Sequence, residues 1–253
     1  MKNSPVSLQQ LHRVLLKLTR RCAAALWRSD ANVVRHKNLL WLLDRRNSVD
    51  RKIISGGYED AQIAHLLSSM EGGCDVFVDV GANFGLYSLQ IAASGRVRHL
   101  IALEPDPRNY AQLLANLYLN EMATKVQTHC LAASDREGMV AFEVYPASST
   151  GQSRIITEAA RSSRSIEVPT KPLDTLLPQA ARRLFFKIDV EGHEIAVLRG
   201  SENLLRTNDC FLQIESWPEN ADALKSYMQS IGYRCIHTIK EDYYFDKASL
   251  PTS

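Results

Sequence analysis

The sequence predicts an α/β fold in which a mostly parallel central sheet carries helices on both faces. From residue 76 onward, short runs rich in β-branched residues alternate with longer helical segments, as strands joined by right-handed helical crossovers do. With 253 residues, 45% of them hydrophobic and 23% charged, the chain is long enough for one large domain with an appendage. This composition excludes a disordered, fibrous or disulfide-stabilised protein.

Basic residues are concentrated in the N-terminal segment. Residues 1–52 carry 12 lysines and arginines against 3 acidic residues, whereas the remainder is acidic overall. Apolar residues at three- and four-residue spacing predict an amphipathic helix over residues 8–27. We therefore expect a basic N-terminal helical arm over residues 1–55 and a main domain over residues 56–253, divided at Gly56-Gly57. The arm could present a solvated face, or contact a membrane surface, a glycolipid or another partner.

The elements of the main domain follow in order along the chain. Strands are expected at 76–80, 99–103, 126–131, 184–188 and 211–215, and helices at 86–93, 107–119, 196–205 and 221–231. Strands at 139–145 and 165–169 flank a loop at 147–165 that is rich in Ser, Thr, Gly and Arg, which predicts an inserted β-hairpin or flap. Strands at 234–239 and 243–245 have no helix between them, so we expect a terminal hairpin with an antiparallel C-terminal strand.

A glycine-containing turn follows the first strand of the main domain, in the run Asp79-Val80-Gly81-Ala82-Asn83-Phe84-Gly85. Ligands of open α/β sheets bind outside the carboxyl ends of the strands, where small residues let them approach the backbone. The dinucleotide fingerprint Gly-x-Gly-x-x-Gly fails here, because Asn83 and Leu86 replace its second and third glycines. Asp79 would repel a phosphate but could hold a cationic amino group.

The second strand ends at Glu104, which lies 19 residues after Gly85. In this architecture the carboxylate at that position accepts hydrogen bonds from ribose hydroxyls. The structural alternative is a carboxylate that interacts with the dipole of the next helix, but Asp106 can cap that helix by itself. A nucleoside with a cationic tail and no phosphate satisfies both Glu104 and Asp79. S-adenosylmethionine is such a molecule, and it is the cofactor that we expect.

Four blocks of the sequence, in order, resemble the FkbM-type methyltransferases. They are Asp79–Gly85, Leu103-Glu104-Pro105-Asp106-Pro107, Ala132-Ala133-Ser134-Asp135, and Lys187-Ile188-Asp189-Val190-Glu191-Gly192-His193-Glu194. The resemblance covers about residues 72–217 and implies a Rossmann-like class I S-adenosylmethionine-dependent methyltransferase fold. It further implies that the cofactor's methionine end is lined by Asp79, Gly81, Ala82, Asn83 and Gly85, its ribose held by Glu104, and its adenine bordered by Ala133, Ser134 and Asp135. His193 stands where a small residue is commoner in the family.

The candidate catalytic residues Lys187, Asp189, Glu191 and His193 lie where a later strand ends in the same crevice. An alcohol must lose a proton when it is methylated, and Asp189 is the expected base because it is the first polar group beyond the strand. Lys187 lies on the same strand face and is expected to pair with Asp189 and lower the pKa of its carboxyl. Glu191 and His193 could bind substrate hydroxyls. A divalent metal held by these residues is possible but not favoured, and we predict no metal site.

The resemblance implies O-methylation of a hydroxyl on a small molecule, sugar or glycolipid. Two alternatives remain open: a nucleic-acid methyltransferase that binds phosphates through the basic arm, and a non-catalytic module that docks through the arm. The sequence has no adjacent prolines, which argues against methylation of the amino group of a base. It also has no Pro-Cys pair, which argues against methylation of a cytosine carbon. The five dispersed cysteines and the lack of an apolar run of about 18 residues predict a cytoplasmic protein with reduced thiols. The acceptor and the oligomeric state are not predicted.

Overall fold

The computed structural model describes residues 30–177 and 183–247. The helix expected over residues 8–27 lies outside these ranges. Within them, no helix combines the length and the apolar character that crossing a membrane requires.

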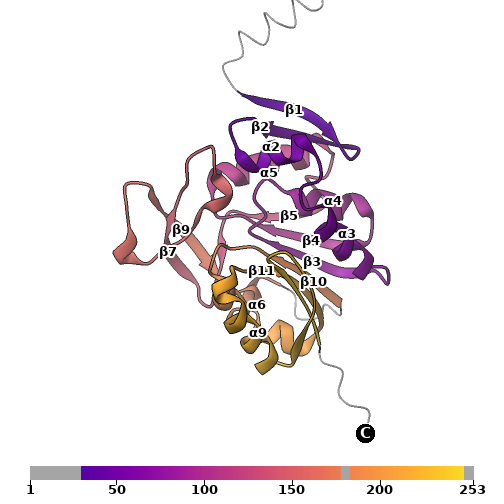
Figure 1. The fold of residues 1–253 in the computed structure, drawn as a ribbon, viewed down its shortest axis with the longest axis vertical. Helices are drawn as coiled ribbons and strands as arrows, with labels where there is room; N and C mark the ends of the chain where they lie inside the picture. Colours follow the sequence, from indigo (N-terminus) through magenta and orange to yellow (C-terminus); the bar gives the residue numbers. More distant parts are fainter. Residues whose placement is uncertain (1–29, 178–182, 248–253) are drawn as a thin grey trace, which may run out of the picture.

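A seven-stranded sheet forms the centre of the molecule (Figure 1). Its strand order is β12-β13-β11-β10-β3-β4-β5. The five strands from β11 to β5 are parallel, and β13 runs antiparallel to both β11 and β12. Both the mostly parallel sheet and the antiparallel C-terminal strand confirm the sequence prediction. The strands are β3 (Cys74–Val80), β4 (Val97–Leu103), β5 (Val126–His129), β10 (Arg183–Ile188), β11 (Asp209–Glu215), β12 (Tyr233–Ile239) and β13 (Asp242–Lys247).

Helices cover both faces of this sheet because successive side chains of each strand point to opposite sides. Phe77 of β3 belongs to a buried cluster with side chains of α3 (Asp60–Ser69), α4 (Leu86–Ser94) and α5 (Pro107–Leu119). Its neighbour Val78 belongs to a second cluster with side chains of the helices on the other face. Those helices are α6 (Leu173–Leu176), α7 (Glu194–Arg199), α8 (Glu202–Thr207) and α9 (Ala221–Ser230).

The single helix expected at 196–205 is divided into α7 and α8. Gly200 lies at the division, and a Cβ at that position would approach the Ser134 carbonyl oxygen to 1.9 Å. The hydroxyl of Ser201 turns back to donate a hydrogen bond to the Val197 carbonyl oxygen, at 2.7 Å. The close contact with the Ser134 backbone therefore leaves room only for glycine at the end of α7.

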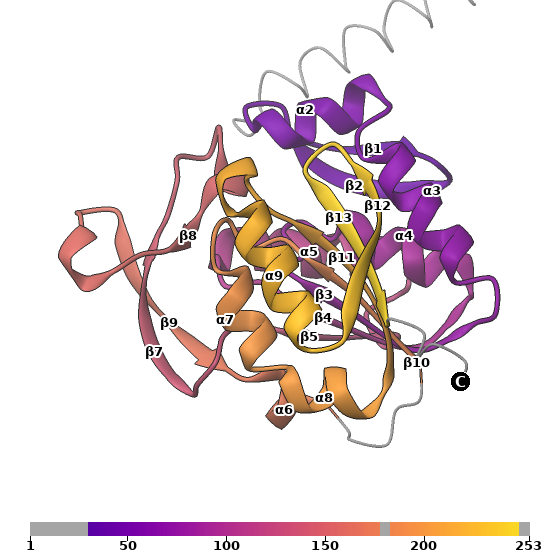
Figure 2. The same cartoon turned by 60° about the horizontal axis from the view of Figure 1, so that its bottom comes forward.

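A smaller sheet is inserted between β5 and β10 and projects to one side of the domain (Figure 2). Its order is β6-β9-β7-β8, with β7 antiparallel to β9, which matches the expected hairpin. The short strands β6 and β8 were not expected. The strands are β6 (Ala132–Ala133), β7 (Gly138–Glu143), β8 (Arg154–Ile155) and β9 (Ser165–Lys171), and two 3-10 turns, η1 (Thr150–Gln152) and η2 (Glu158–Ala160), lie in the connection.

The expectation of a helical arm up to residue 55 is wrong for residues 31–44. These residues form a hairpin of β1 (Ala31–His36) and β2 (Leu39–Asp44), and the helix α2 (Ser48–Ser55) follows it. Lys37 and Asn38 both have positive φ, as the two central residues of a type I′ hairpin turn do.

Two features join this hairpin to the main domain. The amide oxygen of Asn116 in α5 accepts a hydrogen bond from the Leu42 backbone N–H, at 2.6 Å. Trp41 and Leu43 are fully buried in the cluster that contains Phe77. This part of the N-terminal segment therefore shares a core with residues that follow position 56.

Candidate functional site

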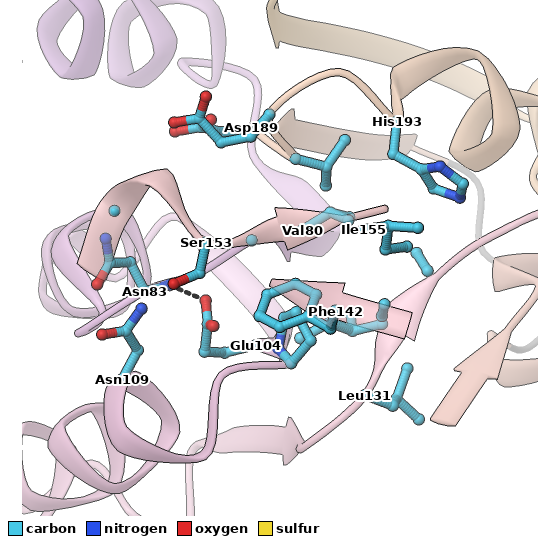
Figure 3. Close-up of a pocket in the computed structure, with 18 of the residues that line it drawn as sticks. Val80, Asn83, Glu104, Asn109, Leu131, Phe142, Ser153, Ile155, Asp189 and His193 are labelled. Carbon is cyan, nitrogen blue, oxygen red and sulfur yellow. Dashed lines mark hydrogen bonds between the residues drawn. The ribbon is translucent and has the colours of Figure 1, made fainter. Parts of the chain in front are cut away.

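The carboxyl ends of β3, β4 and β10 open into a cleft of about 550 Å³, the solvent at its mouth included (Figure 3). Polar side chains line one part of it and apolar ones another. The polar lining includes Asn83, Glu104 and Asp189, and the apolar lining includes Leu131, Phe142 and Ile155. A cleft of this mixed character suits a small organic ligand.

The turn after β3 depends on Gly81 in two ways. Its φ is +81°, a conformation that other residues adopt at a cost, and a Cβ there would lie 1.8 Å from the Asp189 carbonyl oxygen. The backbone N–H groups of Gly81 and Ala82 both donate to the Leu103 carbonyl oxygen, at 2.9 Å. The turn is thus held against β4 on one side and β10 on the other. Gly85 begins α4 with a φ of +96°.

Glu104 connects the two turns that border the cleft. Its Oε2 accepts from the Asn83 N–H and its Oε1 from the Asp106 N–H, both at 2.7 Å. Asp106 itself caps α5 by accepting from the Arg108 N–H, as the sequence predicted. Glu104 is 4% exposed, and its burial raises the pKa of the carboxyl to about 8.

We expect Glu104 to make the stability of the protein depend on pH. Its pKa is raised from 4.5 to about 8 in the folded state, so its stabilising contribution is complete below about pH 4.5 and is lost as the pH rises through 8. Glu104→Gln should reduce the fall in unfolding free energy between pH 5 and pH 8 by at least about 1.4 kcal/mol, one pKa unit. Urea denaturation of both proteins at pH 5 and pH 8 measures the change in unfolding free energy between the two pH values. Any hydrogen bonding that the variant loses equally at both pH values cancels from this change. An unchanged difference would contradict the raised pKa.

Asp79 lies at the end of β3, and one of its two carboxylate oxygens accepts hydrogen bonds from α4. Its Oδ2 accepts from both the N–H and the hydroxyl of Ser88, at 2.9 and 2.6 Å, and so anchors α4. The residue is 2% exposed, and burial raises the pKa of its carboxyl to about 6. Its Oδ1 has no hydrogen-bond partner among the described residues. Asp79 lines a second cavity rather than the first.

The residues expected to border an adenine divide into two groups. Ala133 lines the first cavity, as does Ala132, which was not among the expected residues, whereas Ser134 and Asp135 are not part of its lining. The Ser134 hydroxyl lies 2.9 Å from Nε2 of His193, and burial lowers the pKa of the imidazole. The structure therefore brings His193 to Ser134, at the edge of the first cavity.

The second cavity adjoins the first and measures about 400 Å³, the solvent at its mouth included. Gly81, Asn83 and Asp189 line both cavities, so Asp189 stands where the two meet. No hydrogen bond to the Asp189 carboxylate is present among the described residues. The other residues of the second lining include Tyr58, Glu59, Asp79, Tyr87, Lys187 and Glu215.

The expected pairing of Lys187 with Asp189 is wrong. The Lys187 ammonium contacts Asp242 at 2.9 Å and Glu215 at 3.3 Å instead. The pKa of Asp189 is raised well above its usual range, first by burial and then by the negative charge of Glu215, and Lys187 only partly opposes this shift. Asp189 is accordingly a stronger base than an exposed aspartate.

Glu191 lines the first cavity together with Asp189 and His193. Its φ is +52°, and burial, with Glu215 contributing, raises the pKa of its carboxyl to about 7. Across residues 30–177 and 183–247, no group of three or more histidines, cysteines or acidic residues is arranged to hold a metal ion.

Several residues of the site come from segments that motif analysis did not select. The inserted loop contributes Thr150 and Ser153, and Ser153 donates a hydrogen bond to Oδ2 of Asp106, at 3.0 Å. Asn47, before α2, donates to the Thr150 hydroxyl at 2.6 Å, so the loop spans from the N-terminal segment to α5. Arg154 lies over the Trp217 ring, 5.7 Å from its centre. The composition of the loop was a signal for its exposure, but no spacing pattern indicated these partners.

Comparisons with known proteins show what this chain is similar to. The family profile described as "Methyltransferase FkbM domain" matches residues 79–235. The chain is similar to the hexuronic acid methyltransferase AglP of Haloferax volcanii, 27% identical over 152 residues, which are 60% of each chain. It is also similar to methyltransferase 1 of Beauveria bassiana, 26% identical over 145 residues, 50% of this chain and 58% of that protein.

The match to these relatives is partial, since the chain spans about 60% of their length. Among solved structures, methyltransferase FkbM from Methylobacillus flagellatus aligns with 69% of this chain and 44% of its own, at 21% identity and a TM-score of 0.49. The profile match covers more than half of the chain and includes the turn after β3, Glu104 and Asp189. The protein belongs to the FkbM methyltransferase family.

Proposed function

We propose that this protein is an S-adenosylmethionine-dependent O-methyltransferase that acts on a hydroxyl of a small molecule, sugar or glycolipid. The observation that carries the proposal is the position of Asp189, a carboxylate with a raised pKa, where two cavities meet. Family membership supports methyl transfer, and the relative named a hexuronic acid methyltransferase supports a sugar-like acceptor.

The first cavity fits a nucleoside that carries positive charge and no phosphate. Its lining in the described part of the chain contains Glu104, Asp189 and Glu191 but no lysine or arginine. Glu104 would hold the ribose hydroxyls, and the apolar side chains of Leu131, Phe142 and Ile155 offer surfaces for a planar base. When bound, the cofactor supplies an electrophilic methyl group on a sulfonium.

The chain's own contribution to the reaction would be positioning and proton removal. Gly81 allows the ligand to approach the backbone, and the loop that contains Thr150 and Ser153 borders the first cavity. The Asp189 carboxylate would accept the proton that the acceptor hydroxyl loses during transfer. Its raised pKa places it closer to the operating pH than an ordinary aspartate.

Calorimetric titration with S-adenosylmethionine and S-adenosylhomocysteine tests the cofactor. We expect saturable binding of both ligands, a loss of at least tenfold in affinity in Glu104→Ala, and no binding of NADH. Removal of Glu104 takes away the ribose acceptor and also frees the N–H groups of Asn83 and Asp106. Glu71→Ala is the matched control. Glu71 is exposed in the turn before β3, at the amino end of that strand, whereas the cleft lies at the carboxyl ends. If neither S-adenosylmethionine nor S-adenosylhomocysteine binds the unaltered protein, the proposed function is wrong.

A further inference from the structure

Exposed basic residues gather at the end of the molecule where the described chain begins. There β1 and α2 pack against each other, at the same end in both views (Figures 1 and 2). Two acidic residues of this segment, Asp30 and Asp44, both pair with Arg46, at 3.4 and 2.7 Å. The third, Asp50, is only 1% exposed. Four exposed basic residues have no ion pair in the described part of the chain: Arg35, Arg45, Arg51 and Lys52.

Two large aliphatic side chains are exposed on the same two elements. Val33 of β1 is 54% exposed, and Ile54 of α2 is 40% exposed. Ile54 lies three positions after Arg51, so these two side chains are neighbours on the helix surface. A surface that mixes cations with exposed aliphatic groups suits a lipid bilayer, because the phosphates of the headgroups attract the cations while the aliphatic groups enter the apolar boundary. Nucleic acids instead favour cations combined with aromatic or hydrogen-bonding groups.

Residues 1–29 lie outside the described ranges, but they lead into β1 at this end and add charge of the same sign. They contain six lysines and arginines and no acidic residue. In the helix that the sequence predicts over residues 8–27, Arg13, Lys17 and Arg20 fall on the side opposite to the apolar stripe. A basic amphipathic helix with leucines on its other face is typical of segments that lie in the plane of a membrane surface.

We propose that β1, α2 and the segment before them form a docking surface for a membrane that contains anionic lipids. Charge complementarity identifies the partner, since the cations of this surface would lie against the phosphates of the headgroups. Val33 and Ile54 would enter the boundary between the headgroups and the acyl chains. Only exposed side chains take part, so docking leaves the core that contains Trp41 and Leu43 unchanged.

The proposed docking surface borders the candidate site. Asn47, which caps α2, donates a hydrogen bond to Thr150 in the lining of the first cavity, and Val49 of α2 lines the second cavity. A membrane bound by α2 would therefore lie close to the cleft. This arrangement favours an acceptor that is presented at a membrane surface, such as a glycolipid, over a freely diffusing one. That consequence rests on the proposed function, whereas the docking itself does not.

Sedimentation of the whole chain with lipid vesicles tests the docking. Vesicles of phosphatidylcholine alone are compared with vesicles that contain about 30 mol% phosphatidylglycerol. We expect at least about tenfold tighter binding to the anionic vesicles, and a weakening of that binding when the salt concentration rises from about 0.1 M to about 0.5 M. Equal binding to the two kinds of vesicle, or no binding to either, overturns the proposal. Tighter binding to polyuridylic acid than to the anionic vesicles, compared per phosphate, also overturns it.

Substitutions on α2 assign the binding to this surface. The double variant Arg51→Gln/Lys52→Gln should bind the anionic vesicles at least about fivefold more weakly, because each cation near a charged headgroup layer contributes to the affinity. Arg199→Gln/Lys225→Gln is the matched control. Both of its residues are exposed on helices that cover the other face of the sheet, and its lysine lies over a tyrosine ring as Lys52 does. Normal affinity in the α2 variant, or an equal loss in the control, overturns the role of α2.

The variant Ile54→Ser tests the apolar contribution without a change of charge. We expect it to bind the anionic vesicles at least about threefold more weakly. Met139 of β7, which is 59% exposed, provides the control, and Met139→Ser should bind normally. Normal binding by Ile54→Ser overturns the insertion of this side chain into the bilayer.

Titration with S-adenosylhomocysteine separates the docking from the proposed function. We expect the unaltered protein to bind both this ligand and the anionic vesicles. Binding of the vesicles without binding of S-adenosylhomocysteine would overturn the proposed function and leave the docking intact. The reverse result would overturn the docking alone.

Discussion

Replacing Gly81 with alanine is expected to destabilise the protein by about 3 kcal/mol or more and to abolish cofactor binding. A Cβ at this position would lie 1.8 Å from the carbonyl oxygen of Asp189, and the φ of +81° is unfavourable for alanine. Because the obstacle is backbone, it cannot be relieved by a change of rotamer. For a domain of this size the loss corresponds to a fall of roughly 6–12 °C in Tm, measured by calorimetry of the apoprotein.

The variant Gly95→Ala separates the effect of the positive φ from the effect of the steric collision. Gly95 ends α4 with a φ of +68°, but a Cβ there would have nothing within 4 Å. This control carries the conformational penalty without the collision, so its cost should be about 1 kcal/mol and its affinity for S-adenosylhomocysteine should be normal. Equal losses of stability in the two variants would show that the contact between Gly81 and Asp189 is unimportant.

Asp189→Asn is expected to lower kcat by roughly 100- to 10,000-fold, the range typical of a lost general base, while the affinity for S-adenosylmethionine stays within a few-fold of normal. The reason is that no residue in the described ranges donates a hydrogen bond to this carboxylate, whereas the backbone N–H of Asp189, which the variant retains, donates to the Val80 carbonyl oxygen at 2.9 Å. The rate is measured with a hydroxylated acceptor that the unaltered protein methylates, and cofactor affinity is measured by calorimetry.

The pH profile of the same reaction distinguishes a base from a structural residue. Because the pKa of Asp189 is raised, activity should increase with pH through values above the usual aspartate range, and this increase should disappear in Asp189→Asn. Asp222→Asn, an exposed aspartate in the first turn of α9, should show the normal profile. Normal turnover by Asp189→Asn would mean that another group removes the proton.

The part of the fold that repeats a local pattern could be predicted from the sequence. Buried parallel strands are continuous apolar runs and amphipathic helices have their own period, so the mostly parallel sheet with helices on both faces followed from their alternation. The turn after β3 could also be predicted, because Gly81 and Gly85 occur between the expected strand and the expected helix. Motif spacing placed Glu104 and Asp189 at the ends of β4 and β10, the two strands that flank β3 in the sheet.

Other features depend on contacts that no local pattern records. The apolar run Leu39–Leu43 is compatible with a helix or a strand, and pairing with β1 together with docking against Asn116 and Asn120 of α5 selects the strand. Lys187 lies two positions from Asp189, yet it pairs with Asp242, 55 positions along the chain. Glu59 reaches the second cavity from a segment with no chemical motif, so its position became visible only in three dimensions.

The pairing of β3 with β10 has a consequence for folding kinetics. These neighbouring central strands are distant in sequence, and the hydrogen bond from the Arg183 N–H to Asp75 at their start spans 108 positions. Closing such a long loop costs entropy before any contact compensates for it, so topologies rich in distant pairings fold slowly. Asp189 and the turn at Gly81 can meet only after that closure. We therefore expect ligand-binding competence to be acquired in a late kinetic phase, after the local helices have formed.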